Sequence, residues 1–90
     1  MKALRKHVGG PWEVIDVEND IRALQYQVDG YIEVVTLCSN AAIIVDEEGL
    51  IKGKPFNTRI AGLNIVGTVL IVGTAYDDFC DVDTRILKYL

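Results

Sequence analysis

Three consecutive polar side chains, Asn57, Thr58 and Arg59, form the segment of this chain best suited to bind a ligand. They offer an amide, a hydroxyl and a guanidinium, and a guanidinium can bind a carboxylate or phosphate through two parallel hydrogen bonds. In a functional interpretation the segment is a small-molecule site. In a structural interpretation, which we favour, Asn57 hydrogen-bonds its own backbone. Arg59 then pairs with a nearby acid, either Asp46 or Glu48.

Acidic residues form two groups along the chain. Asp46, Glu47 and Glu48 precede Gly49 in a predicted turn, where their charge suits a basic groove on a protein partner. The second group consists of Asp77, Asp78, Asp81 and Asp83. It lacks the alternating acids, the glycine and the closing Glu of a calcium-binding loop. We therefore predict no metal site, and we expect Asp83 to cap a helix.

The chain carries no recognisable enzyme motif. Its single histidine, His7, has no Ser or Cys partner nearby in the sequence, so we expect a surface residue and not a general base. Ile-Val-Gly-Thr occurs twice, at residues 65–68 and 71–74, but lacks the Lys-Ser/Thr pair of a phosphate loop. We predict a protein that is not an enzyme and needs no cofactor.

Length and charge narrow the classes further. Ninety residues with 50% apolar composition predict a single folded domain, residues 1–90. Thirteen acidic residues against nine basic ones give a net charge of −4, which argues against direct nucleic-acid binding. The start of the chain lacks a signal-peptide pattern, and the longest apolar run, residues 65–75, is too short to span a membrane. We expect a cytoplasmic protein of a bacterial host, with Cys38 and Cys80 as buried structural thiols.

Alternation and turn residues predict the elements that must position these side chains. The fold class is α+β, with a mostly antiparallel small sheet of five to seven short strands and two helices packed on one face. For residues 55–61 the sequence does not decide between a loop and a single helical turn. For residues 65–74 it does not decide between one strand and a strand pair. The expected strands are 1–7 and 12–18, which form a hairpin, and 31–37 and 41–46, which form an antiparallel pair. The expected helices are 21–28, capped by Asn19 or Asp20, and 84–90.

Two features indicate contact surfaces. Tyr26 lies off the apolar helical stripe of Ile21, Leu24 and Val28, so we expect it to be exposed and able to anchor a protein interface. Most other aromatic side chains should lie in the core. A small sheet also leaves edge strands, which often pair across a two-fold axis, so a homodimer is expected as an option.

The order of motifs resembles a family of small uncharacterised proteins of bacteriophages, prophages and mobile elements of Gram-positive bacteria. The matching pieces are Met1–Leu4, Leu24 with Gly30–Val35, Val45–Gly49 (VDEEG), Pro55 with Asn57 and Arg59, and Gly67–Gly73 (GTVLIVG). A phage setting implies an accessory protein that binds a host component, and anti-defence proteins, including inhibitors of CRISPR nucleases, are a well-populated class of these. This step is an analogy of context.

Two functional hypotheses follow. In the first, the protein binds and inhibits a host protein through Tyr26 and the acidic turn Asp46, Glu47 and Glu48, and a nucleic-acid-handling defence enzyme is one such target. In the second, an oligomer sequesters a nucleotide-type signal. That ligand would be held by Asn57, Thr58 and Arg59.

Overall fold

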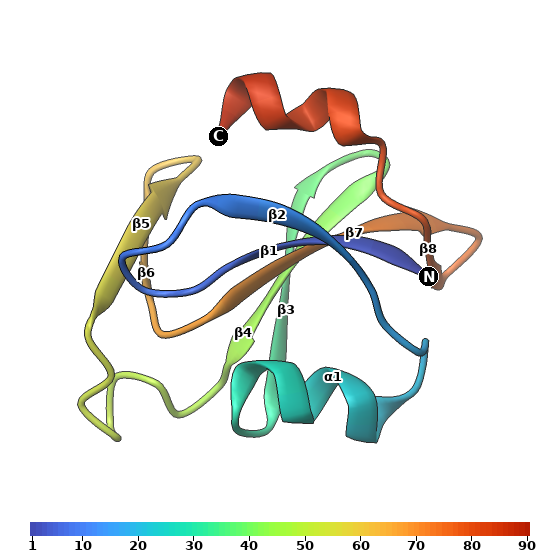
Figure 1. The fold of residues 1–90 in the computed structure, drawn as a ribbon. Helices are drawn as coiled ribbons and strands as arrows, with labels where there is room; N and C mark the ends of the chain where they lie inside the picture. The colour runs from blue at the N-terminus through green and yellow to red at the C-terminus, as the bar shows by residue number, and fades with distance from the viewer.

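The computed structural model describes residues 1–90 and contains two antiparallel sheets, one α-helix and one 3-10 helix (Figure 1). The strands are β1 (Lys2–Lys6), β2 (Trp12–Asp16), β3 (Ile32–Cys38), β4 (Ala41–Asp46), β5 (Phe56–Ile60), β6 (Leu63–Val66), β7 (Val69–Ala75) and β8 (Asp78–Cys80). The helices are α1 (Ile21–Val28) and the 3-10 helix η1 (Thr84–Tyr89).

The larger sheet has six strands in the order β2-β1-β7-β4-β3, with β8 paired to β7. Strands β5 and β6 form a separate two-stranded sheet. Every pairing is antiparallel. The α+β class and the antiparallel sheet are therefore confirmed, although the chain forms eight strands, one more than the upper end of the expected range.

The two central strands are β7 and β4, and both are apolar without interruption over most of their length. Leu70 lies opposite Ile44 and Ile71 lies opposite Ile43 in the register. Because side chains alternate across a strand, each pair belongs to a different core cluster, one on each face of the sheet. A continuous apolar run is the pattern of a strand covered on both sides.

The two helices cover opposite faces of the sheet, which corrects the expectation that both pack on one face (Figure 1). On one face, Leu24 and Val28 of α1 join the cluster that contains Leu70. On the other face, Ile86 of η1 packs against the cluster that contains Ile71, together with the β5–β6 hairpin. The reason lies in the central strands, since a sheet that is apolar on both faces needs a cover on each.

Several local predictions are confirmed. The β1–β2 hairpin and the β3–β4 pair form as expected. Asp20 caps α1 by accepting a hydrogen bond from the Ala23 N–H at 2.9 Å, and Asp83 caps η1 by accepting from the Arg85 N–H at 3.0 Å. At the end of α1, Asp29 adopts the left-handed conformation, with φ 55°.

The structure resolves both open segments. Residues 56–60 form strand β5, so neither the loop nor the helical turn considered for residues 55–61 is correct. The apolar repeat divides into β6 and β7, which belong to different sheets. Gly67, with φ 71°, lies between them in a left-handed conformation that favours glycine, and it redirects the chain from one sheet to the other.

The core is aliphatic, which corrects two burial predictions. Cys38 and Cys80 are exposed thiols and not buried ones. Tyr31 and Phe56 are more than half exposed and Tyr76 is fully exposed, so most aromatic side chains lie outside the core. The physical reason is the small size of the domain, whose interior is filled by Ile, Leu, Val and Ala from both faces of one sheet.

Candidate functional site

The acidic turn begins with a buried carboxylate. Asp46 ends β4, and only 1% of its side chain is exposed. Its Oδ2 atom lies 2.9 Å from Nζ of Lys52 and 2.7 Å from Nζ of Lys54, and its Oδ1 atom accepts a hydrogen bond from the Glu48 N–H at 2.9 Å. A buried carboxylate needs such partners, because an unpaired charge in the interior is strongly destabilising.

The same two lysines also bind the end of α1. Nζ of Lys54 donates to the Val28 carbonyl at 2.7 Å, and Nζ of both lysines donates to the Asp29 carbonyl at 3.1 Å. The last turn of α1 has no basic residue of its own, and cations stabilise the negative end of a helix dipole. Residues 47–54 are therefore tied to both β4 and α1. We call this arrangement of Asp46, Lys52 and Lys54 the lysine clasp.

The lysine clasp keeps Asp46 ionised. Burial raises the pKa of Asp46, but hydrogen bonds from Lys54, Lys52 and the Glu48 N–H outweigh it and lower the pKa from 3.8 to about 2. The hydrogen bond to Asp46 in turn raises the pKa of Lys52 above its usual value. The group is a structural cluster in which two ammonium groups surround one carboxylate, and the side chain of Asp46 is almost completely buried.

This geometry corrects the expected acidic surface. Asp46 faces the interior, Glu48 is half-buried and Glu47 alone of the three is exposed. Arg59 makes no ion pair with Asp46 or Glu48, because Lys52 and Lys54 occupy the Asp46 carboxylate. The sequence contains the signal for this pairing in two lysines that flank Gly53 shortly after the acids, but it does not show which acid they reach.

The lysine clasp presents large apolar side chains at the tip of the segment that it holds. Leu50 is 80% exposed and Ile51 is 85% exposed, in the segment that Lys52 and Lys54 connect to the C-terminal end of α1. Tyr26, on the outer side of α1, is 84% exposed, as predicted. We call these three side chains, with Glu47 and Glu48, the α1-end surface. Leu50 and Ile51 were missed in the sequence because they lie between turn residues and show no periodicity.

The second predicted group, residues 57–59, does not converge on one point. Asn57 is buried, and its amide nitrogen donates to the Lys6 carbonyl at 2.8 Å and to the Gly67 carbonyl at 2.7 Å. Its Oδ1 atom accepts a hydrogen bond from Nζ of Lys6 at 2.7 Å. Asn57 thus joins β1 and the β6–β7 turn to β5, and does not hydrogen-bond its own backbone as the structural interpretation supposed. Thr58 and Arg59 are adjacent in β5 and so point to opposite faces.

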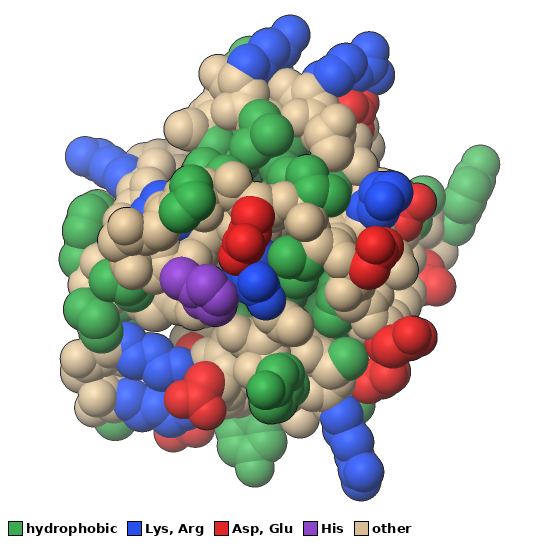
Figure 2. All heavy atoms as spheres, viewed as in Figure 1, with side chains coloured by type: hydrophobic (Ala, Val, Ile, Leu, Met, Phe, Trp, Pro, Cys, Tyr) green, Lys and Arg blue, Asp and Glu red, His purple; other side chains and the backbone are tan.

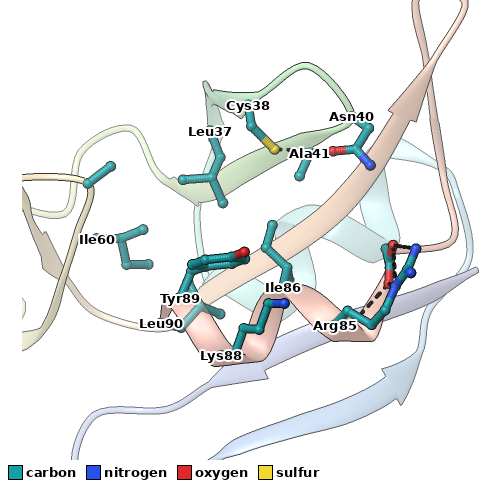
Figure 3. Close-up of a pocket in the computed structure, with 12 residues that line it drawn as sticks. Leu37, Cys38, Asn40, Ala41, Ile60, Arg85, Ile86, Lys88, Tyr89 and Leu90 are labelled. Atoms are coloured by element: carbon teal, nitrogen blue, oxygen red, sulfur yellow. Dashed lines mark hydrogen bonds and ion pairs between the residues drawn. The ribbon is translucent and has the colours of Figure 1, made fainter.

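A cavity of about 500 Å³ lies between η1 and two turns of the sheets (Figure 3). We call it the η1 cavity. Leu37 and Ala41 come from the β3–β4 end, Ile60 from the β5–β6 end, and Ile86 and Leu90 from the C-terminal segment. These side chains make the cavity predominantly apolar. The sequence did not predict it, because its walls come from three distant segments.

The rim of the η1 cavity holds its polar groups. Arg85 is bound to Asp83, with NH2 2.7 Å from Oδ2, and this hydrogen bonding lowers the pKa of Asp83 to about 2. Lys88 has no carboxylate partner, and its Nζ atom lies 5.1 Å from the centre of the Tyr89 ring. The Cys38 thiol donates to Oδ1 of Asn40 at 3.2 Å. The cavity therefore combines apolar walls with one free cation.

His7 acquires a hydroxyl partner that the sequence did not indicate. Its Nδ1 atom lies 2.9 Å from Oγ1 of Thr68, a residue 61 positions away. The Glu13 carboxylate lies 4.0 Å from Nε2 of His7, but it is bound more closely by Arg5, at 2.9 Å. The group is exposed, and neither His7, Thr68 nor Glu13 lines the η1 cavity.

The structure gives little support to a metal site, a membrane-spanning helix or a broad basic surface. No group of three or more His, Cys, Asp or Glu side chains is arranged to hold a metal ion, and every buried side-chain polar atom has a hydrogen-bond partner. No helix has the length and apolar character needed to cross a membrane. Figure 2 shows acidic, basic and apolar side chains interspersed, with no broad basic area on the face that it presents.

The whole chain matches one family model, which is described as a domain of unknown function (DUF3846) and covers residues 1–90. The chain belongs to the DUF3846 family. Searches among curated proteins and among solved structures gave no match. The DUF3846 description assigns no activity, and the two features of the molecule suited to binding are the α1-end surface and the η1 cavity.

Proposed function

We propose that this DUF3846 protein is a non-enzymatic binding module that attaches to a partner protein through the α1-end surface and inhibits it. The observation that carries the proposal is the exposure of Tyr26, Leu50 and Ile51, each at least 80%. Leu50 and Ile51 are adjacent in the chain, and contiguous exposed apolar side chains commonly mark an interaction site. Aromatic side chains are also enriched among the residues that contribute most to interface affinity.

The lysine clasp supports the same proposal. Lys52 and Lys54 fix the segment that carries Leu50 and Ile51 to β4 and to the end of α1. A segment that is already ordered loses little conformational entropy when it binds. The α1-end surface is therefore preorganised for binding in the free protein.

Charge favours a basic partner. The chain has a net charge of −4, and Glu47 lies exposed next to the apolar side chains. Complementary charge at the rim of an interface increases the association rate and favours the right partner. A host defence enzyme that handles nucleic acid carries a basic groove, and the sequence resemblance to phage and prophage proteins points to the same class. We propose an anti-defence role, in the host cytoplasm, on this basis.

The test combines capture with reconstitution. The immobilised protein is exposed to an extract of its bacterial host, and a captured protein is identified, purified and titrated calorimetrically. Tyr26→Ala with Ile51→Ser should weaken the affinity about tenfold or more, since two interface anchors are lost. The matched control is Tyr76→Asn, which removes a fully exposed aromatic side chain from the β7–β8 turn and keeps a residue type that tolerates its φ of 53°. Equal affinity of the double variant and the wild type would rule out the α1-end surface as the binding site. Failure to inhibit the captured protein would rule out the proposed inhibitory function.

The η1 cavity supports a second candidate function, the sequestering of a small molecule. Its volume of about 500 Å³ lies within the range of ligand sites, and Lys88 and Tyr89 offer a cation and an aromatic ring for a nucleotide-type ligand. Native mass spectrometry of the purified protein should then show a retained ligand that Lys88→Gln with Tyr89→Ala loses. If Arg59→Ala loses the ligand and the cavity variant keeps it, the site is the Asn57–Arg59 segment instead.

A further inference from the structure

The outer edge of β3 is unpaired, and the register shows which of its backbone groups are free. β3 ends the strand order of the larger sheet. The Tyr31 carbonyl accepts a hydrogen bond from the Glu47 N–H at 2.8 Å, so Tyr31 points its backbone groups toward the β4 side. Because this direction alternates along a strand, Glu33 and Val35 also face β4. The N–H and C=O groups of Ile32, Val34 and Thr36 therefore point away from the sheet.

The β3 edge also lacks the features that normally prevent edge pairing. Natural edge strands carry charges, especially lysine, or proline, which block the approach of a second strand. β3 has seven residues and a single charge, Glu33, and Val34 is 47% exposed. The sequence of the strand, IEVVTLC, is rich in β-branched residues, which favour strand pairing.

The opposite edge, β2, is better protected. It has only five residues, Pro11 comes directly before it, and it carries the two acids Glu13 and Asp16. The Val17 N–H donates to the Met1 carbonyl at 2.9 Å, so by the same alternation the outward groups of β2 belong to Trp12, Val14 and Asp16. β2 thus differs from β3 in length and charge, while Val14, at 49% exposed, matches Val34 closely.

We infer that β3 pairs with β3 of a second copy of this chain, antiparallel and across a two-fold axis, with Val34 opposite the same residue of the other copy. In this register Ile32 lies opposite Thr36 on both sides of the axis, so all three outward-facing residues are paired. Three such pairs exchange about six hydrogen bonds, since each hydrogen-bonded pair makes two. This inference goes beyond the proposed function, which concerns the exposed side chains of the α1-end surface and not the free edge of a strand.

Two neighbouring registers are less favourable. Placing Glu33 opposite itself brings two carboxylates together across the axis, and like charges in that position are destabilising. Placing Val35 opposite itself pairs Ile32 with Cys38, beyond the irregularity at residues 36–38, where the strand departs from its register. Only the Val34-centred register places Glu33 opposite Val35 and avoids both problems.

The pairing would also add residues of the second copy to the border of the η1 cavity. Leu37 lines that cavity at its β3 side. In the Val34-centred register, the antiparallel arrangement brings Tyr31 of the second copy to the end of β3 that carries Leu37. Tyr31 is 66% exposed in the single chain, although it adjoins a strand. The second copy would thus cover Tyr31 and extend the cavity.

The first test is the mass in solution of matched proline variants. Wild type should show about twice 10.0 kDa by light scattering at micromolar concentration. Val34→Pro should give the monomer mass, because proline removes an outward N–H and leaves the hydrogen bonds to β4 intact. Val14→Pro, the equivalent change at the β2 edge, should remain dimeric. Val34→Lys, which keeps the backbone N–H and adds an edge charge, should also be monomeric, and serves if the proline variant does not fold.

The second test fixes the register. In a background with Cys38→Ser and Cys80→Ser, the two single variants Glu33→Cys and Val35→Cys are prepared separately and then mixed under oxidation. A disulfide-linked dimer should form in the mixture and not in either variant alone, because the two residues face each other only across the axis. A wild type that is monomeric throughout, a dimer lost in Val14→Pro but kept in Val34→Pro, or crosslinking of Glu33→Cys with itself would each overturn the proposal.

Discussion

Nζ of Lys54 lies 2.7 Å from Oδ2 of Asp46, a carboxylate that the sequence places in an exposed acidic turn and the structure places in the interior. The same ammonium donates to the Val28 carbonyl at the end of α1, so one side chain joins a strand, a loop and a helix. The VDEEG motif is therefore not itself the contact surface that the sequence predicts. Through Asp46, it holds in place the segment that carries the α1-end surface. It also leads to the first three predictions.

Asp46→Asn should lower the free energy of unfolding by about 2–3 kcal/mol, because it leaves Lys52 and Lys54 gathered at the end of α1 without their counter-ion. Urea unfolding followed by circular dichroism measures the change. The control is Glu47→Gln, one residue further on and exposed, which should change stability by less than about 0.5 kcal/mol. If the two variants were equally stable, the lysine clasp would not hold the fold together.

Stability should fall with acidity in a defined window. The pKa of Asp46 is about 2 in the folded protein and 3.8 as its ordinary value, so its contribution is fully present above pH 4. That contribution, about 1–2 kcal/mol, is lost as the pH falls from about 4 toward 2, because the unfolded state then binds the proton more readily. Urea midpoints measured across this window should decrease in wild type and decrease less in Asp46→Asn. A parallel decrease in both proteins would contradict the assignment to Asp46.

Gly30→Ala should destabilise the protein because the added methyl group clashes with a single side chain, that of Asp46. A Cβ atom at Gly30 would overlap the Asp46 carboxylate, although the backbone conformation there does not itself demand glycine. We expect a loss of about 2 kcal/mol, typical of overpacking at a tight site. In an Asp46→Ala background, which removes the carboxylate, the same change should cost little, and this coupling is the decisive measurement. Gly10→Ala, where the nearest atoms leave room for a Cβ, should be nearly neutral.

Asn57→Ala should cost about 2–3 kcal/mol of unfolding free energy, because it leaves the Lys6 and Gly67 carbonyls without their donors in a buried position. Thr58→Ala and Arg59→Ala should each cost less than about 1 kcal/mol, since neither side chain makes a hydrogen bond of this kind. Thermal or urea unfolding of the three variants gives the comparison. A neutral Asn57→Ala would mean that the amide is not structural and would return it to the list of ligand-binding candidates.

Both cysteines should react with Ellman's reagent in the native protein without denaturant, because both side chains are exposed. Cys38→Ser and Cys80→Ser should each remove half of the colour change. Protein unfolded in urea provides the reference for complete reaction. A thiol that reacts only after unfolding would show that it is protected in solution.

The elements with local signals could be predicted from the sequence. Alternation of apolar and polar residues indicates β1, β2 and β3, and a continuous apolar run indicates β4. Asp20 and Asp83 identify the helix starts because a cap acts on its immediate neighbours. β5 was missed for a physical reason: one of its two buried side chains is Asn57, an amide, and the other is Ile60 at its end, so the strand shows no apolar alternation. Its hydrogen bonds lie on β1 and at Gly67, far away in the sequence.

The candidate site also contains some features that the sequence predicts from local patterns and others that depend on contacts between distant segments. The exposure of Tyr26 could be derived from its place outside one helical stripe. The burial of Asp46 could not, because whether a carboxylate lies inside depends on cations that reach it, and the sequence offers several acids to Lys52 and Lys54. The η1 cavity could not either, since Leu37, Ile60 and Ile86 come together only when the sheets and the C-terminal segment pack.

By itself, the sequence of this protein determined that it forms one antiparallel α+β domain, because periodicity and caps operate over a few neighbouring residues. Only the tertiary structure decided which charge is buried, which apolar side chains remain outside and which strand edge stays open. Each of these depends on the balance between desolvation and partners from distant segments, as the position of Asp46 between Lys52 and Lys54 illustrates.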